Sequence, residues 1–392
     1  MTDETLRAEM RAYIEAHCPA SLRTPMLTYE DRAYGGTKST MNADQRAWLS
    51  AMADRGWTAP TWPKEYGGGG LSDRETGILR EEMARIQARP PLEEYGLSML
   101  GPALLKHGTE EQKREHLPKI VRGERRWCQG YSEPGAGSDL ASLSTAARID
   151  GEDFIVDGTK IWTSHAHRAD WIFCLVRTDK DAPKHKGISV LLIDLTSPGV
   201  SVRPIQLISG HGHFCETRFE DVRVPKGNLL GPLNDGWEIA KFILVQERQM
   251  YGDHAKRGVE AKSLGQLAAD TLPRDEHGRL KDPMLRADIL RLELRTKGFE
   301  AARARLRAAG GAAGMAPFLK LYGTELNKER QDILMQIGGP ASYGWDGPAF
   351  DDGQVVKNWL RSRGNSIEGG TSEIQLNLLA QRVLKLPKDK RE

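Results

Sequence analysis

The spacing of apolar residues changes twice along this chain, and this change constrains the fold more than any single motif. In the first third, apolar residues recur at helical spacing, as in LRAEMRAYIEAH and ETGILREEMARI. In the middle they alternate in short β-branched runs such as DFIVDGTKIWTS and GISVLLIDL, and helical spacing returns after GPLNDGW. The pattern predicts an α+β protein with a helical domain over residues 1–123, a β domain over 124–231 and a helical domain over 232–392.

The predicted strands follow one another without intervening helices, and no GxGxxG turn follows any of them. Both features argue against a doubly wound sheet, and therefore against a nicotinamide site of the Rossmann type. A chain of 392 residues with 39% hydrophobic content is long enough to build two or three subdomains, each with its own core.

The charge balance and the composition of individual segments exclude some classes of binding partner. The chain has 56 Lys and Arg against 54 Asp and Glu, a balance that argues against binding nucleic acid or a membrane surface through bulk charge. No apolar run approaches the ~20 residues of a membrane span, and the N-terminus has no apolar signal region. The four cysteines form no CxxC pair, which is typical of reduced thiols. We therefore expect a cytoplasmic protein.

A loop rich in glycine and serine, WCQGYSEPGAGSDLASL, leads into the β domain. Its glycines let a backbone approach a ligand closely, and Ser132 and Ser138 offer hydroxyl groups to polar atoms. A simple turn explains the same residues equally well.

About 20 residues further on, a strand delivers Trp162 beside Thr163 and Ser164. An indole beside a hydroxyl suits a planar aromatic ligand, although a tryptophan that caps the β core is an alternative. His165 and His167 follow, but no third ligand stands at a suitable spacing, so we expect no metal site.

Seven motifs in the same order resemble the acyl-CoA dehydrogenase family, and the resemblance covers nearly the whole chain. They are WTAPTWPKEYGGGG, GTEEQKREHLPKIVRGE, YSEPGAGSDLASL, GTKIWTS, FEDVRVPKGNLLG, the Glu247-Arg248 pair and IEGGTSEIQ. The resemblance implies an N-terminal helical domain, a middle β-barrel-like domain and a C-terminal four-helix bundle. It also implies that FAD accepts a hydride from Cβ of an acyl-CoA while a carboxylate removes the Cα proton, giving a trans-2-enoyl-CoA.

The family pattern implies where the cofactor and substrate bind. Contacts to the flavin or the thioester are implied for Tyr131, Ser132, Gly137 and Ser138, with Trp162 over a ring face and Ser164 near N5. Further cofactor contacts are implied for Gly338, Gly339, Thr371 and Glu373, and substrate contacts for Ser138, Arg248 and Gly370.

The position of the catalytic base is the main question that the resemblance raises. In the commonest branch of the family the base directly precedes Gly-Thr-Ser, where this chain has Gly369 instead, and Glu368 lies one position too early. The isovaleryl-CoA type of branch takes its base from an earlier Glu-Arg pair, which matches Glu247 and Arg248. We therefore expect Glu247 to be the catalytic base, with Glu368 as the second choice. The alternative for Glu247 is a surface ion pair with Arg248, which is the usual role of a Glu-Arg pair in an arbitrary helix.

Two departures from the family concern the cofactor. The Arg-x-x-Phe-Gly segment that binds the pyrophosphate of a neighbouring subunit's FAD is missing, and Met335 replaces the usual glutamine before the Gly338-Gly339 turn. Either a homo-oligomer, dimer or tetramer, holds FAD through residues such as Arg274 or Arg279, or a related chain completes the site in a hetero-oligomer. The second arrangement resembles bacterial dehydrogenases of bulky substrates such as steroid side-chain CoA thioesters.

Two further points stay open at this stage. The expected electron acceptor is an electron-transfer flavoprotein, while oxidases and monooxygenases of the same superfamily use oxygen instead. The segment RPPLEEYGLSMLGPALL, with small residues at Gly96 and Gly101, either lines the acyl pocket or makes a helix contact.

Overall fold

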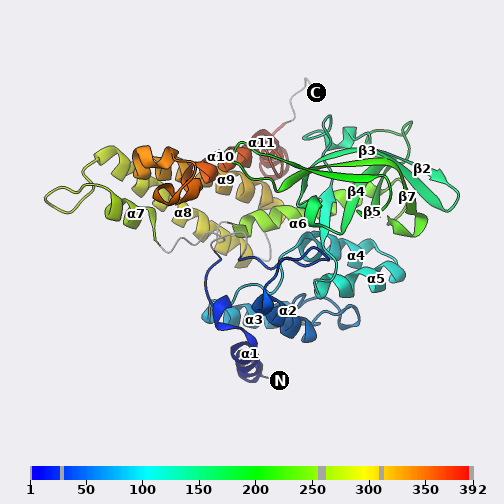
Figure 1. Ribbon diagram of the computed structural model, residues 1–392, viewed down its shortest axis with the longest axis horizontal. Helices are drawn as coiled ribbons and strands as arrows, with labels where there is room; N and C mark the ends of the chain where they lie inside the picture. Colours follow the sequence, from blue (N-terminus) through cyan, green and yellow to red (C-terminus); the bar gives the residue numbers. More distant parts are fainter. Residues whose placement is uncertain (1, 27–30, 255–261, 309–312, 388–392) are drawn as a thin grey trace. The chain divides into compact units, whose positions relative to one another are not determined.

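The computed structural model describes residues 2–26, 31–254, 262–308 and 313–387, without the side chains of residues 247–254, 307, 313 and 349. The chain forms two compact units (Figure 1). Unit 1 comprises Met1–Ile205 and His213–Leu244, and unit 2 comprises Gln206–Gly212 and Val245–Glu392.

Helices make up the first part of unit 1. They are α1 (Asp3–His17), α2 (Ala43–Asp54), α3 (Asp73–Arg85), α4 (Gly101–His107) and α5 (Glu110–Val121). Three of them begin with a capping box, in which two side chains three residues apart satisfy each other's backbone N–H groups. The pairs are Asn42 with Gln45, Ser72 with Glu75, and Thr109 with Gln112. These local signals fix where the three helices start.

The core of these helices follows from their spacing. Leu6, Met10 and Ile14 of α1 recur every four residues, so they share one face of the helix. That face packs against Trp48 of α2 and Trp57 in the connection that follows it. The same cluster includes Ile78 and Leu79 of α3, and burial of the two indole rings supplies much of the apolar area that holds α1, α2 and α3 together.

The second part of unit 1 is one mixed eight-stranded sheet, drawn in teal and green in Figure 1. Its strands are β1 (Trp127–Gly130), β2 (Ala146–Asp150), β3 (Asp153–Ser164), β4 (Trp171–Arg177), β5 (Ile188–Asp194), β6 (Val200–Ile205), β7 (Phe214–Pro225) and β8 (Leu229–Leu230). The order is β6-β7-β3-β2-β4-β5-β8, and β1 pairs with β4. Most pairs are antiparallel, whereas β1 and β2 run parallel to β4. Strands β4 and β5 are buried along nearly their whole length, so the alternation expected for GISVLLIDL is wrong: both faces of these strands are covered.

The longest pairing, between β3 and β7, contains two irregularities. Its register shifts between Val156 and Gly158 and again between Lys160 and Thr163. A β-bulge of this kind re-aims the side chains that follow it and is common next to functional sites. The second shift therefore decides how Trp162 is presented.

Unit 2 is helical. Helix α6 (Gly236–His254) spans the boundary between the units along the chain. It is followed by α7 (Leu264–Thr271), α8 (Pro283–Ala308), α9 (Ala316–Gly338), α10 (Gln354–Ser362) and α11 (Ser372–Leu378). Leucine, isoleucine and phenylalanine side chains of α7, α8 and α9 form one buried cluster, with Phe299 and Ile333 among its members.

The predicted order of helical, sheet and helical parts is confirmed. The domain boundaries at residues 123 and 231 stay a prediction. Within the described residues, no helix combines the length and the apolar character needed to cross a membrane.

Candidate active site

The glycine-rich loop after β1 is organised around a buried carboxylate, Glu133. Its oxygens accept hydrogen bonds from the backbone N–H groups of Ser144 at 2.7 Å and Thr145 at 2.9 Å. The ammonium group of Lys160, a buried residue of β3, donates to Glu133 Oε1 at 2.7 Å. Burial alone would raise the pKa of Glu133, but Lys160 and the surrounding donors lower it to about 2. The carboxylate is therefore ionised and fixes both ends of the loop.

Lys160 adds a second tie between the sheet and the loop. Its ammonium group also donates to the backbone carbonyl of Tyr131 at 3.1 Å, and the N–H of Ile161 donates to the carbonyl of Ser132 at 2.9 Å. The loop that carries Tyr131 and Ser132 is thus bound directly to β3. Neither Glu133 nor Lys160 was predicted from the sequence, although a lysine within an apolar strand signals that a buried partner is needed.

The tip of this loop is open. Gly137 and Ser138 are exposed, and a Cβ added to Gly137 would meet no atom within 4 Å. Tyr131, in contrast, is buried at the base of the loop, and Ser132 is half-buried. The structure therefore leaves the Gly137-Ser138 tip accessible to a ligand while its base is anchored.

Trp162 projects from the bulge in β3. Half of its surface is exposed, and its backbone adopts a φ of 60°, a region that bulky residues rarely occupy. Such a conformation costs about 1–3 kcal/mol and is retained mainly where function requires it. The ring of Phe214 on β7 meets the indole edge-on at 5.9 Å, and Ser164 follows two residues later, half-buried. An oriented, exposed indole beside a hydroxyl matches a platform for a planar ligand.

The neighbouring histidines, His165 and His167, contact other protein groups. His165 is held by a hydrogen bond from its N–H to the carbonyl of His213 at 2.6 Å. Burial, together with the charge of Arg126, lowers the pKa of His165 to about 2, so its ring is neutral. The Nδ1 atom of His167 lies 3.1 Å from the sulfur of Cys215. Among the described residues, no group of three or more His, Cys, Asp and Glu side chains has a geometry suited to a metal ion.

In unit 2, the carboxylate of Glu368 is fully engaged. Arg361 of α10 donates to both of its oxygens, at 2.6 Å and 3.2 Å, and Asn365 donates to Oε1 at 2.6 Å. The backbone N–H of Glu368 donates to the carbonyl of Gly364 at 3.0 Å. A bidentate arginine pair fixes a carboxylate in orientation as well as in position. Neither Arg361 nor Asn365 was predicted from the sequence as a partner of this glutamate.

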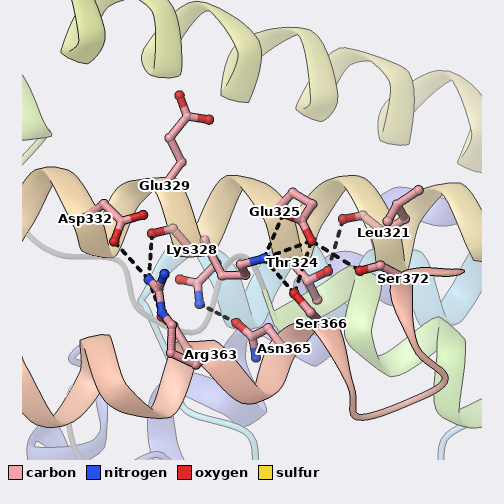
Figure 2. A network of polar contacts seen from close by, with 12 residues as sticks. Leu321, Thr324, Glu325, Lys328, Glu329, Asp332, Arg363, Asn365, Ser366 and Ser372 are labelled. Carbon is pink, nitrogen blue, oxygen red and sulfur yellow. Dashed lines mark hydrogen bonds and ion pairs between the residues drawn. The ribbon is translucent and has the colours of Figure 1, made fainter.

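The loop of residues 365–372 is attached to α9 by a polar network (Figure 2). Lys328 donates to Glu325 at 2.9 Å and to the hydroxyl of Ser366 at 2.6 Å. The hydroxyl groups of Ser366 and Ser372 donate to the same Glu325 oxygen at 3.3 Å and 3.2 Å. One carboxylate thus holds the two ends of the loop on the same helix.

Three further bonds complete this attachment. The buried ammonium group of Lys320 donates to the carbonyl of Asn365 at 2.8 Å, and Asn327 donates to the side-chain oxygen of Asn365 at 2.7 Å. Arg363 donates to Asp332 at 3.1 Å, as the left side of Figure 2 shows. The loop therefore has little freedom relative to α9.

The double glycine lies in the middle of the loop. Gly369 and Gly370 adopt φ values of 63° and 90°, which favour glycine strongly at both positions. Gln375 donates to the carbonyl of Gly369 at 3.0 Å, and the hydroxyl of Thr371 caps α11 by accepting from the N–H of Ile374 at 3.2 Å. Glu373, in the first turn of α11, is exposed.

The remaining predicted residues lie in helices of unit 2. Gly338 ends α9, where a Cβ would come within 2.1 Å of the Ser342 hydroxyl, and Gly339 follows with a φ of 53°. Both glycines are explained by the chain reversal at this point. Glu247 and Arg248 lie within the bounds of α6, and their side chains are outside the described part of the structure.

Three sequence models cover most of the chain. Residues 2–124 match the N-terminal domain of acyl-CoA dehydrogenases, residues 128–222 the middle domain and residues 234–384 the C-terminal domain. Acyl-CoA dehydrogenase IpdE1 of Mycobacterium tuberculosis is 35% identical over 388 residues, with 97% of this chain and 98% of the relative covered. The chain belongs to the acyl-CoA dehydrogenase family.

The protein is accordingly an oxidoreductase that acts on a CH–CH bond of an acyl-CoA. The human mitochondrial short-chain specific acyl-CoA dehydrogenase is 29% identical over 356 residues, covering 86% of this chain and 82% of the relative. Among solved structures, the Tcur3481-Tcur3483 steroid ACAD is 33% identical with a TM-score of 0.77, and 98% of each chain is covered. The ChsE4-ChsE5 complex from Mycobacterium tuberculosis is 29% identical with a TM-score of 0.72, and 99% of each chain is covered.

Proposed function

We propose that this acyl-CoA dehydrogenase uses FAD to form a trans-2-enoyl-CoA and that Glu247 is the base that removes the Cα proton. The observation that carries this assignment is the engagement of the rival carboxylate. Glu368 would have to give up hydrogen bonds from Arg361 and Asn365 before it could reach a substrate proton. Gly369 occupies the position next to it, so no carboxylate stands at the site used by the commonest branch of the family.

The residues of the sheet domain fit a flat cofactor such as the FAD isoalloxazine ring. Trp162 offers an exposed indole face in a strained backbone conformation, and the adjacent loop tip is open at Gly137. When bound, FAD would supply the acceptor for the Cβ hydride. We propose that its contacts are Tyr131, Ser132, Gly137, Ser138, Trp162 and Ser164 in unit 1, and Gly338, Gly339, Thr371 and Glu373 in unit 2.

The substrate contacts are proposed on the same basis. Ser138 lies at the exposed loop tip, and Gly370 lies in the loop that α9 anchors, where a side chain would be strained at a φ of 90°. We propose that both, with Arg248, contact the acyl-CoA. Backbone and hydroxyl donors at the thioester oxygen would stabilise the enolate-like charge that develops when Glu247 takes the proton.

We further propose that a second, related chain completes each flavin site. Arg274 donates to the carbonyl groups of Ala269 and Gly278, and Arg279 pairs with Asp275 at 2.9 Å, so both arginines fold onto their own loop. They are therefore poor replacements for the missing pyrophosphate contact. Similar structures include one named as a complex of ChsE4 and ChsE5 and one named as a Tcur3481-Tcur3483 steroid ACAD, which supports a hetero-oligomer acting on a bulky acyl group.

Exposed apolar residues in unit 2 support association with another chain. Leu290 and Leu294 of α8 lie one turn apart on the same face and are 60% and 72% exposed. Leucine side chains at such exposure are typical of surfaces that a partner covers.

The proposed electron acceptor is an electron-transfer flavoprotein or a similar protein.

A comparison of two glutamine variants tests the proposed function. With FAD bound, the Glu247→Gln variant is expected to bleach its flavin about 10²–10⁴-fold more slowly than wild type on mixing with acyl-CoA. The matched Glu368→Gln variant is expected to stay within about threefold of wild type, since the same change falls on a carboxylate outside the reaction. If Glu368→Gln is the slow variant and Glu247→Gln is not, the assignment is wrong.

A further inference from the structure

Gln375 of α11 is a buried side chain that contacts the double-glycine turn directly. It is 1% exposed, and its amide nitrogen donates to the carbonyl of Gly369 at 3.0 Å and to the carbonyl of Gly370 at 3.3 Å. Two consecutive peptide groups of the turn therefore share one donor. None of the roles described above uses this side chain.

The two contacts fix the orientation of the Gln375 amide. Both groups that it meets are carbonyl oxygens, so only its NH₂ end can face them, because its own oxygen would be repelled. The other end, Oε1, is buried and has no hydrogen-bond partner among the residues that the structure describes. A buried oxygen without a partner costs free energy, and each such case in a native protein calls for an explanation.

Gly370 fits tightly against this amide. A Cβ added to Gly370 would come within 2.4 Å of Gln375 Nε2, and the backbone of Gly370 has a φ of 90°. A side chain at this position would therefore strain the backbone and displace the amide as well. The glycine and the glutamine depend on each other for their positions.

The two hydrogen bonds also decide where the adjoining N–H groups point. The C=O and the N–H of a trans peptide lie on opposite sides, and no peptide bond in the described part of the chain is cis. The carbonyl of Gly369 shares a peptide group with the N–H of Gly370, and the carbonyl of Gly370 shares one with the N–H of Thr371. Both N–H groups therefore point away from Gln375, and neither donates to a protein group among the described residues.

We propose that Gln375 is a positioning residue that aims the N–H of Gly370 at the acyl-CoA thioester oxygen and the N–H of Thr371 at the cofactor. It touches neither ligand and acts through the two peptide groups that it holds. The inference rests on the proposed function, in which Gly370 contacts the substrate and Thr371 contacts FAD. A donor at the thioester oxygen stabilises the charge that develops as Cα loses its proton, and its effect depends on accurate placement.

The Gln375→Met variant tests this role, because methionine has a similar length but no N–H donor. The probe is an acyl-CoA analogue with sulfur in place of Cβ, which can lose the Cα proton but has no hydride to give. Its enolate absorbs at long wavelength beside oxidised flavin, so a pH titration measures the acidity of the bound Cα–H. In the FAD-loaded enzyme, with its partner chain if one is needed, Gln375→Met is expected to make this group about tenfold less acidic.

Two further quantities should change in the same variant. With a reactive acyl-CoA, kcat is expected to fall about 10- to 100-fold while KM stays within about threefold, because the lost interaction forms mainly in the transition state. The Kd of FAD, measured by fluorescence titration without substrate, should rise about tenfold, because the N–H of Thr371 is no longer held in place.

Asn377→Met is the matched control, because Asn377 is an exposed amide on the same helix. It should leave kcat, the Kd of FAD and the acidity of the analogue at their wild-type values. Gly370→Ala displaces the Gln375 amide from the other side, so it should reproduce the effects of Gln375→Met.

The outcomes separate positioning from a merely structural role. Unchanged acidity of the analogue in FAD-loaded Gln375→Met would overturn the proposal, even if that variant is less stable. A change in the acidity of the analogue with no change in the Kd of FAD would overturn the shared role of Gln375. Failure of every acyl-CoA to bleach the wild-type flavin would instead contradict the proposed function.

Discussion

The ammonium nitrogen of Lys160 lies 2.7 Å from the carboxylate of Glu133, and both side chains are almost fully buried. This contact joins strand β3 to the loop proposed to bind flavin and thioester. Desolvation of two charges is offset only when both are present and well bonded. The pair therefore makes the loop conformation depend on an intact salt bridge.

Single substitutions in this pair are expected to be severe. Lys160→Met or Glu133→Gln should lower the free energy of unfolding by about 3–5 kcal/mol, because each leaves a buried group without its partner. The double variant Lys160→Met with Glu133→Leu should cost clearly less than the sum of the two single changes. Urea titrations of all variants measure the difference, and strict additivity would argue against a coupled pair.

Acid should destabilise the protein through His116, which is buried, and His165, which is half-buried. The pKa of His116 is lowered to about 4 and that of His165 to about 2, chiefly by burial, so the unfolded chain binds more protons below pH 6.5. The free energy of unfolding should therefore fall as the pH decreases from about 6.5 to 4, by up to about 1.4 kcal/mol per pH unit for each histidine. His116→Gln does not titrate and should reduce that slope. An unchanged slope would show that His116 does not contribute.

Glu133 acts in a lower pH window. Its folded pKa of about 2 lies below the value in an unfolded chain, so its contribution is present above about pH 4.3 and is lost as the pH falls towards 2. In the Glu133→Gln variant, stability should depend less on pH between about 4.3 and 2 than in wild type. Denaturation curves at several pH values would show this, and parallel curves for the two proteins would contradict it.

Substitutions of Trp162 separate the cost of its backbone strain from the contribution of its indole ring to FAD binding. Both Trp162→Ala and Trp162→Gly should reduce FAD affinity by about tenfold, because each removes the stacking surface. Trp162→Gly should nevertheless be the more stable of the two by up to about 1 kcal/mol, since glycine tolerates the φ of 60°. Fluorescence titration with FAD and chemical denaturation give the two quantities. Equal stability of the variants would mean that the backbone is not strained.

The polar network beneath residues 365–372 predicts a positioning role for Glu325. Glu325→Ala removes the acceptor shared by Lys328, Ser366 and Ser372, and should cost about 1–2 kcal/mol of unfolding free energy. FAD retention after gel filtration should fall as well, because Thr371 and Glu373, two proposed cofactor contacts, flank Ser372. Glu329→Ala, on the same helix, is the control. Normal FAD retention in Glu325→Ala would exclude this role.

The colour of the purified chain tests the proposed assembly. Expressed alone, the protein should carry substoichiometric FAD, and co-expression with a related acyl-CoA dehydrogenase chain from the same source should bring the FAD-to-protein ratio to its full value. Arg274→Ala and Arg279→Ala should leave that ratio unchanged. A fully yellow protein from the single chain would point to a homo-oligomer instead.

Local patterns predicted much of the architecture. Helical and alternating spacing gave the order of the three parts, and the capping residues Asn42, Ser72 and Thr109 mark helix starts that follow directly from local chemistry. The motifs also identified the family and the exposed Trp162. These features depend on residues within a few positions of each other, which is why the sequence reveals them.

Partners distant in sequence were not predictable. Lys160 meets Glu133 across 27 positions, and Glu325 meets Ser372 across 47, through a strand and a helix whose placement depends on the whole fold. The irregularity at Trp162 likewise arises from a register shift between β3 and β7. A lysine within an apolar strand signals that a buried partner is needed, but no local pattern identifies which residue supplies it.

The sequence by itself determined the helix and strand periods, the family and the position of Gly369 where other members have a glutamate. Tertiary structure alone decided that Arg361 and Asn365 hold Glu368, and that Lys160 is buried against Glu133. The physical reason is that periodicity and turn chemistry are local properties of the chain. Ion pairing and desolvation, in contrast, depend on which side chains the folded chain brings together.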